Sequence, residues 1–438
     1  MNPVVTPPAG PVGLVLTGGG ARAAYQVGVL REIAHIARLC GISGPSPFKV
    51  ITGTSAGAIN AAALACQADD YAGAIQAMFD VWSNFEAEQV YRADSLSMIR
   101  AGAPWLVMLS LGWAVARWRR AKPRSLLDNS PLESLLTEMV AFDRLPHLMA
   151  AGHVHALAVT GSCYSTGMHV TFYESRTELP VWTRSQRIAV RCGLNVRHLL
   201  ASSAIPFVFP AQQLDTEDGP QWFGDGSMRQ AAPISPAVHL GAERVLIVGA
   251  GRMHEPPGQR AHAEGYPSVA QIAGHTLSNI FLDALSVDVE RLQRINSTLA
   301  LLTPEQRENT ALRPIEALVI APSERLDDLA AQHLNALPLT MRTLLRSLGV
   351  NGQGNQAASA TRGAALASYL LFEKDYTRTL IALGEADTRA RRQEVMNFFG
   401  WALPLRASTG VSGNGTTTPS KATASEAATP RSPQTSTH

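Results

Sequence analysis

The first 67 residues contain the same local pattern twice: a short apolar run, a glycine-rich turn and a helix-forming stretch. In the first copy, a strand predicted over Val12–Leu16 leads through three consecutive glycines into a helix predicted over 21–39. In the second, a strand predicted over 48–52 leads through a GTSAG turn into an alanine-rich helix that starts near Ala56. Strands that alternate with helices build a parallel sheet covered on both faces. The pattern therefore predicts an α/β fold.

The rest of the chain is expected to complete this sheet and to add helices around it. Further strands are predicted over 154–160, 170–173, 244–248 and 317–320, and further helices over 70–84, 131–141, 268–300 and 360–397.

The predicted division of the chain follows changes in composition and pattern. Between 86 and 125 the pattern is irregular, which is typical of a lid or membrane-facing insertion in an α/β core. The end of the chain is rich in Ser, Thr, Ala, Gly and Pro and cannot bury enough apolar surface to fold. We expect a flexible N-terminus, an α/β core, a helical extension packed on it and a disordered tail, over 1–11, 12–250, 251–406 and 407–438.

Composition excludes several classes of protein. With 46% hydrophobic and only 16% charged residues, the chain is not wholly disordered. Its 37 basic and 35 acidic side chains nearly cancel, so there is no overall field to attract nucleic acid. The four cysteines have no CxxC spacing for zinc and are too scattered for a disulfide framework, which favours a reducing compartment: Cys40, Cys66, Cys163 and Cys192.

One segment is a candidate for contact with a membrane. The N-terminus has prolines and no basic region, so we expect no cleaved signal, and the apolar run 101–116 is short for a bilayer span and contains Pro104. A cationic stretch follows it, which suits the headgroups of an anionic inner membrane face. A buried helix with a solvated basic end is an equal alternative. The candidate membrane or lid residues are Trp105, Trp113, Arg117, Trp118, Arg119 and Arg120.

The GTSAG turn contains the best candidate nucleophile. Ser55 lies between a predicted strand and a predicted helix, where a sharp turn can expose a serine near a helix N-terminus. Gly53 and Gly57 allow this turn because they carry no Cβ. The alternative is a serine that only caps the helix.

The glycines Gly18, Gly19 and Gly20 predict an anion-binding turn, because adjacent backbone N–H groups can converge on one point near a helix N-terminus. A P-loop is excluded, since the Lys and Ser/Thr that it requires are missing. A dinucleotide fingerprint remains open, although the next strand does not end in the acidic residue that would bind the ribose. The neighbouring nucleophile motif favours an oxyanion hole.

A serine nucleophile needs a base, and two kinds are present. Asp225 lies between two glycines in a GDGS sequence, and it would have to be partly desolvated to act directly. A simple Asp-Gly turn is the alternative. Histidine is the usual partner, and twelve are present. The candidates that lie downstream in the order expected of an α/β-hydrolase, none of them in a distinctive setting, are His239, His254, His262 and His275.

Taken together, GGGAR, GTSAG, the block 201–210 and FGDGS resemble the patatin-like phospholipase family over about 12–236. The resemblance implies a three-layer α/β/α sandwich and a Ser55–Asp225 dyad without a catalytic histidine. It also implies Gly18 to Gly20 as the oxyanion turn, with Arg22 as the basic residue that follows. Two positions depart from the family pattern, Ala23 and Ser227, and neither removes a catalytic atom.

The resemblance implies a lipid acyl hydrolase, of phospholipase A or lysophospholipase type, that needs no metal or cofactor. We expect an acyl-lipid substrate, a cytoplasmic location and peripheral contact with the inner membrane face. Three alternatives remain: an esterase with a histidine base, a dinucleotide-binding module and a catalytically silent membrane-binding protein. Acyl transfer to another alcohol, the headgroup and the oligomeric state are open.

Overall fold

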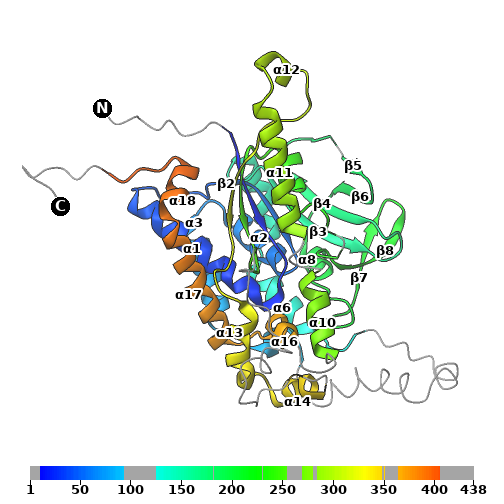
Figure 1. The fold of residues 1–438 in the computed structure, drawn as a ribbon. Helices are drawn as coiled ribbons and strands as arrows, with labels where there is room; N and C mark the ends of the chain where they lie inside the picture. The colour runs from blue at the N-terminus through cyan, green and yellow to red at the C-terminus, as the bar shows by residue number, and fades with distance from the viewer. Residues whose placement is uncertain are drawn as a thin grey trace, which may run out of the picture. The chain divides into compact units, whose positions relative to one another are not determined.

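The computed structural model describes residues 10–92, 125–180, 182–228, 230–253, 269–279, 284–347, 350 and 364–404. These residues form a mixed, mostly parallel sheet with the strand order β10-β9-β1-β2-β3-β4-β6-β5 (Figure 1). In addition, β8 pairs with β3 and β7. Its strands are β1 Val12–Leu16, β2 Phe48–Thr54, β3 Ala156–Cys163, β4 His169–Ser175, β5 Thr183–Arg184, β6 Arg187–Arg191, β7 Gln212–Thr216, β8 Gly219–Asp225, β9 Arg244–Val248 and β10 Glu316–Ile320.

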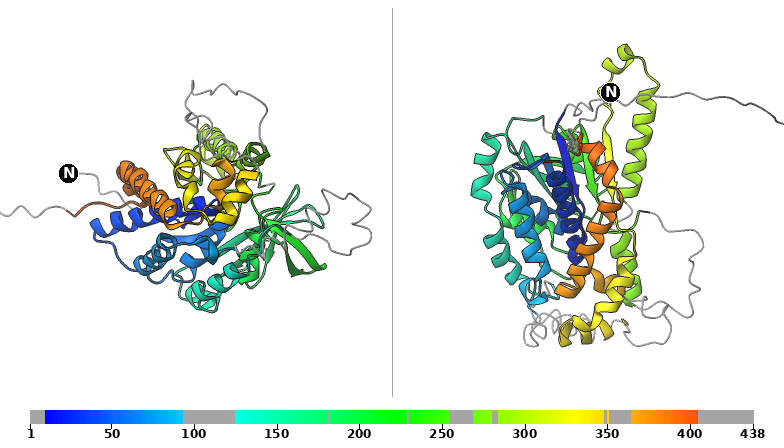
Figure 2. Two further views of the ribbon diagram at one scale, coloured as in Figure 1. Left: turned by 90° about the horizontal axis from the view of Figure 1, so that it is seen from below. Right: turned by 90° about the vertical axis from the view of Figure 1, so that its left-hand side faces the viewer.

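Helices cover both faces of the sheet, as the views in Figure 2 show. They are α1 Ala24–Leu39, α2 Ala56–Ala65, α3 Tyr71–Ser83, α6 Ser130–Met139, α7 Leu145–Ala150, α8 Val196–Ser202, α9 Ser235–His239, α10 Val269–Ser278, α11 Ala284–Ala300, α12 Pro304–Glu308, α13 Leu326–His333, α14 Leu339–Ser347, α16 Ala364–Leu370, α17 Lys374–Ala390 and α18 Arg392–Phe399. A short 3-10 helix, η1, spans Gly20–Ala23.

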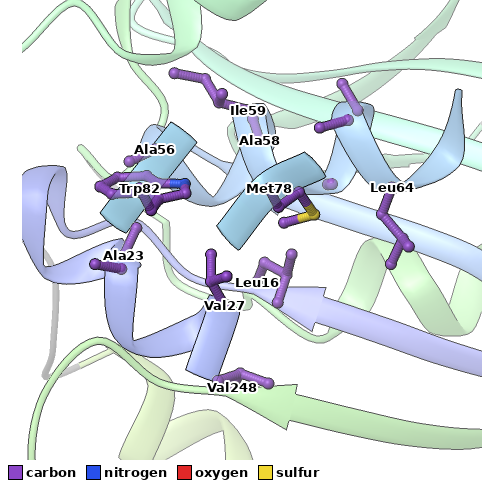
Figure 3. Packing of buried hydrophobic residues seen from close by; sticks show 14 of the residues in the cluster. Leu16, Ala23, Val27, Ala56, Ala58, Ile59, Leu64, Met78, Trp82 and Val248 are labelled. Carbon is purple, nitrogen blue, oxygen red and sulfur yellow. The ribbon is translucent and has the colours of Figure 1, made fainter. Parts of the chain in front are cut away.

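The two faces of the sheet pack into two separate cores, because successive side chains of a strand point to opposite sides. In β1, Leu14 and Leu16 belong to the larger core and Val15 to the smaller. Figure 3 shows part of the larger core, where Leu16 and Val248 from the sheet lie near side chains of α1, α2 and α3. The smaller core is completed by α9 and α11. The architecture is therefore a three-layer α/β/α sandwich, which confirms the predicted fold class.

Helix α17 lies beside α1, although the two are more than 330 residues apart in the sequence (Figure 1). The backbones approach closely: a Cβ on Gly28 of α1 would lie 2.0 Å from the carbonyl oxygen of Ile381, and one on Gly384 of α17 would lie 2.3 Å from that of Tyr25. Helices can pack at this distance only where both have glycine. The chain up to Leu403 thus forms one unit, and its C-terminal helices cover the first helix.

Several predicted elements differ from the observed ones. The helix predicted over 360–397 is divided into α16, α17 and α18, and Glu373 has an extended backbone where the first break occurs. Within 268–300 the structure describes α10 and α11 as separate helices. Strands β5 to β8 and helices α12 to α14 were not predicted at all. The sequence did not predict strands β7 and β8 because they contain polar residues, glycine and proline, which are unfavourable in strands.

Some predictions lie outside the described residues. These are most of the insertion 86–125 with its six candidate membrane residues, residues 1–9 of the N-terminal segment, the first part of the helical extension over 254–268, and the tail from 407. Within the described ranges, every helix is too short or too polar to cross a bilayer.

Candidate active site

Ser55 occupies a sharp turn between β2 and α2. Its backbone angles, φ 55° and ψ −132°, are strained for a residue with a side chain, and such strain is common at active sites. The turn also requires the glycines on either side. A Cβ on Gly53 would lie 2.4 Å from the carbonyl oxygen of Gly57, and a Cβ on Gly57 would lie 2.4 Å from that of Leu16. The two glycines of the motif therefore let the helix start directly against the ends of β1 and β2.

Ser55 and Asp225 meet because two strands approach each other along one edge of β3. Strand β2 runs parallel to β3, with Thr54 opposite Thr160, and Ser55 follows. Strand β8 runs antiparallel to β3 from the other direction and ends with Asp225 opposite Gly161. The hydroxyl of Ser55 donates a hydrogen bond of 2.6 Å to Oδ2 of Asp225.

The carboxyl group of Asp225 is completely buried. Burial raises its pKa from 3.8 to about 6, against the opposing effect of hydrogen bonds from Ser55 and from the backbone N–H of Ser227, at 2.6 and 2.8 Å. A carboxylate with a raised pKa is a stronger base than one in water. The desolvation that a directly acting base would require is therefore present in the structure.

The end of α8 holds the dyad in place, a role that sequence analysis did not assign. The hydroxyl of Ser202 accepts a hydrogen bond from the backbone N–H of Ser55, at 2.9 Å, and donates to the carbonyl of Thr160, at 2.6 Å. The carbonyls of Ala204 and Ser202 accept from the backbone N–H groups of Asp225 and Gly226. The only signal in the sequence was the block 201–210, which carried the family resemblance without a role.

Two more side chains support the turn that follows Asp225. The carbonyl of Gly226 lies 3.0 Å from Nε2 of His169, and burial lowers the pKa of this histidine to about 4, so that it is neutral and donates at physiological pH. The amide of Gln230 donates to Oγ1 of Thr54, at 2.7 Å. Gly226 has no space for a side chain, since a Cβ would lie 2.0 Å from the carbonyl oxygen of Thr160. Nothing in the sequence identified His169 or Gln230.

The glycine turn lies at the end of β1, next to the Ser55 turn. Gly18, Gly19 and Gly20 are all buried, and Gly20 lines the same pocket as Ser55. Gly20 has φ +55°, a conformation that favours glycine. Among the described residues, no acceptor is hydrogen-bonded to the N–H groups of Gly19 and Gly20. These two donors are thus available to a group bound at Ser55.

Arg22 does not line the pocket. Its guanidinium is almost fully buried and donates to Asp327 and to Ser368, which belong to the C-terminal helices. The structure therefore places the backbone of the glycine turn beside Ser55, and directs the Arg22 side chain to a different set of partners.

The pocket at Ser55 is apolar and open to solvent; about 520 Å³ of space, part of it outside the protein, lies between its walls. Besides Gly20, Ser55 and Ser203, all its lining side chains are hydrophobic: Ala56, Ile59, Trp82, Phe85, Val90, Leu132, Leu135, Leu136, Met139, Ile205, Phe209 and Phe372. Walls of this kind are suited to a hydrocarbon chain, and the described lining residues include no carboxylate that could bind a ribose.

No described histidine is hydrogen-bonded to the side chain of Ser55 or Asp225. His239 is hydrogen-bonded to Ser235, four residues earlier in α9, and His275 lies near Asn279 in the segment that includes α10. His254 and His262 lie outside the described residues. Across the described ranges, His, Cys, Asp and Glu also form no group of three or more that could hold a metal ion.

Three solved structures align with this chain at low identity. VipD from Legionella pneumophila aligns with 86% of this chain and 67% of its own, at 12% identity and a TM-score of 0.25. Human GIVD cytosolic phospholipase A2 aligns at 90% and 61%, with 10% identity and a TM-score of 0.36. The type III effector ExoU aligns at 92% and 90%, with 15% identity and a TM-score of 0.25. The chain spans only about three fifths of the human enzyme. At these identities and TM-scores, the alignments support no functional argument.

A search of curated proteins finds no match. A family comparison does: residues 14–238, just over half of the chain, match the family described as patatin-like phospholipase. The matched region begins in β1 and ends in α9, so it contains the glycine turn, the Ser55 turn and Asp225. The chain belongs to the patatin-like phospholipase family.

Proposed function

We propose that this protein is a serine-dependent lipid acyl hydrolase in which Ser55 is the nucleophile and Asp225 is its base. One observation carries the proposal: Ser55 lies on the wall of an apolar pocket, and its hydroxyl donates a hydrogen bond of 2.6 Å to the fully buried carboxylate of Asp225. The family supports the hydrolysis of lipid esters in general. The catalytic dyad of Ser55 and Asp225 is the more specific part of the proposal.

The geometry suits a two-step acyl transfer. As Ser55 Oγ attacks the ester carbonyl, its proton passes to Asp225 and the negative charge develops on the carbonyl oxygen. The N–H groups of Gly19 and Gly20 stabilise this oxyanion. The intermediate then collapses, and the departing alcohol takes the proton from Asp225. In the second step water attacks the acyl-enzyme, gives its proton to Asp225, and the fatty acid leaves as Ser55 recovers that proton.

The pocket indicates which part of the substrate is recognised. Its hydrophobic walls would take up an acyl chain, whose transfer from water contributes about 0.8 kcal/mol for each buried CH₂ group. We therefore propose a fatty-acyl ester substrate, such as a phospholipid or lysophospholipid, supplied from a membrane surface. The headgroup would lie outside the described pocket.

The proposal is tested by replacing Ser55 with alanine. Hydrolysis of a long-chain ester should fall by about 10⁴-fold or more, because the bond-forming atom is removed. The matched control is Ser175→Ala, which removes another buried hydroxyl, one that donates to Thr177 at the far end of β4. Retained turnover in the Ser55 variant, or equal losses in both variants, would contradict the assignment.

A further inference from the structure

We propose that Ser368 of α16 is a positioning residue for the oxyanion turn, acting through the guanidinium of Arg22. This inference rests on the proposed function. It assigns part of the catalytic site to a helix that lies more than 120 residues beyond the region that matches the family.

Arg22 lies two residues after Gly20, and its backbone N–H donates to the carbonyl of Gly19, at 3.1 Å. Any movement of this residue is therefore transmitted to the turn. Its Nε and Nη2 atoms both donate to the hydroxyl oxygen of Ser368, at 2.9 and 2.6 Å. The Ser368 hydroxyl donates in turn to the carbonyl of Ala365, at 2.6 Å, which leaves its lone pairs to accept from Arg22.

The other contacts of Arg22 also come from the C-terminal helices. Nη2 forms an ion pair with Asp327 of α13, and the guanidinium carbon lies 3.9 Å from the centre of the Tyr369 ring. A buried cation is strongly destabilising unless it is paired and hydrogen-bonded. These partners therefore hold Arg22, and with it the start of η1, in one position.

The backbone of α16 contacts the turn as well. A Cβ on Gly20 would lie 2.2 Å from the carbonyl oxygen of Tyr369, so these two backbones are in direct contact. The carbonyl of the next residue, Leu370, accepts a hydrogen bond from Tyr91, at 3.1 Å, and Phe372 lines the acyl pocket. The segment 368–372 thus contacts both the oxyanion turn and the wall of the pocket.

The position of the turn matters because oxyanion donors act only within hydrogen-bonding distance of the developing charge. A small displacement of Gly19 and Gly20 would slow the chemical step and leave the pocket able to bind the acyl chain. Loss of the Ser368 hydroxyl should therefore lower kcat while KM stays nearly constant.

The test compares Ser368→Ala and Asp327→Asn with Glu32→Gln. Glu32 accepts from Arg389, at 2.7 Å, and so links α1 to α17 at a distance from the turn. For Ser368→Ala we expect kcat for a soluble ester, and the rate at which a fluorophosphonate labels Ser55, to fall by about tenfold to a hundredfold. Asp327→Asn should act in the same direction, and the double variant by less than the product, since both act through Arg22. Glu32→Gln should lower only the melting temperature.

The outcomes separate this inference from the proposed function. Normal labelling of Ser55 in the wild type, with unchanged rates in Ser368→Ala and Asp327→Asn, would overturn the positioning role alone. No labelling of Ser55 in the wild type would overturn the proposed function and the inference with it. A rise in KM at constant kcat would place Ser368 in substrate binding and would also refute the positioning role.

Discussion

Replacing Asp225 by asparagine is expected to abolish hydrolysis and, at the same time, to stabilise the fold. The carboxylate is needed as a base, but it is fully buried, and burial raises its pKa to about 6. A group whose pKa is raised in the folded state opposes folding once it is ionised. Asparagine has almost the same shape and remains neutral. Its Oδ1 can still accept from the backbone N–H of Ser227, and its Nδ2 can donate to the hydroxyl oxygen of Ser55, in place of the carboxylate that accepted from both.

The size and the sign of the effect follow from the same pKa. The rise in the pKa of Asp225 from 3.8 to about 6 lowers the free energy of unfolding of the wild type by roughly 3 kcal/mol. This full cost applies at pH values above 6, where the carboxylate is ionised in both the folded and the unfolded state. Below about pH 3 it is protonated in both states and the cost disappears. The gain in the free energy of unfolding from Asp225→Asn should therefore be near zero at about pH 3, increase between about pH 4 and 6, and level off above about pH 6.

The assay is urea unfolding of both proteins at several pH values, with ester hydrolysis measured on the same samples. Asp215→Asn is the matched control, because Asp215 lies in the neighbouring strand β7 with its side chain exposed, and its variant should unfold like the wild type at every pH. A variant at Asp225 that is less stable than the wild type at pH 8, or a difference independent of pH, would refute the reasoning.

Three further predictions concern the base, the pocket and the buried hydrogen bonds of Asn60. The kcat/KM of the wild type for a soluble ester should rise about tenfold per pH unit up to about pH 6 and then level off; a profile without this inflection would exclude Asp225 as the base. Leu136→Trp should reduce kcat/KM for long-chain esters by tenfold or more and affect acetate esters little, since Leu136 lines the pocket; equal losses would place the chain elsewhere. Asn60→Leu should cost about 2–4 kcal/mol in urea unfolding, because Asn60 is hydrogen-bonded to Ala23, Gln26 and Trp82; a loss below 1 kcal/mol would show that these groups find other partners.

Local patterns in the sequence predicted the strands that build the centre of the sheet. Strands β1 and β9 have the predicted bounds, since apolar runs such as Val12–Leu16 are buried on both faces. The same reasoning failed for β8, whose sequence GPQWFGD has no alternating pattern. Its position depends on pairing with β3 and β7, and tertiary contacts of that kind leave no local signal.

The candidate site was only partly accessible from sequence. The motifs identified Ser55 and Asp225 as candidates. The distance of 2.6 Å between Ser55 Oγ and Asp225 Oδ2, however, depends on the register of β2 and β8 against β3. The partners of Arg22 lie 305 and 346 residues further along the chain, so no local pattern could have identified them. Phe372 illustrates the same limit: it lies in the break between two helices, within a segment predicted as one continuous helix, and lines the pocket.

The most direct test of the central claim is to identify the residue that carries the acyl group during turnover. Wild-type protein would be mixed with a long-chain nitrophenyl ester, quenched in acid within the first turnover, digested and analysed by mass spectrometry. The account predicts an added acyl mass on the peptide that contains Ser55, formed in a burst of about one equivalent per active protein molecule. An acyl group on a different residue, or acid release with no covalent adduct at any time, would contradict it.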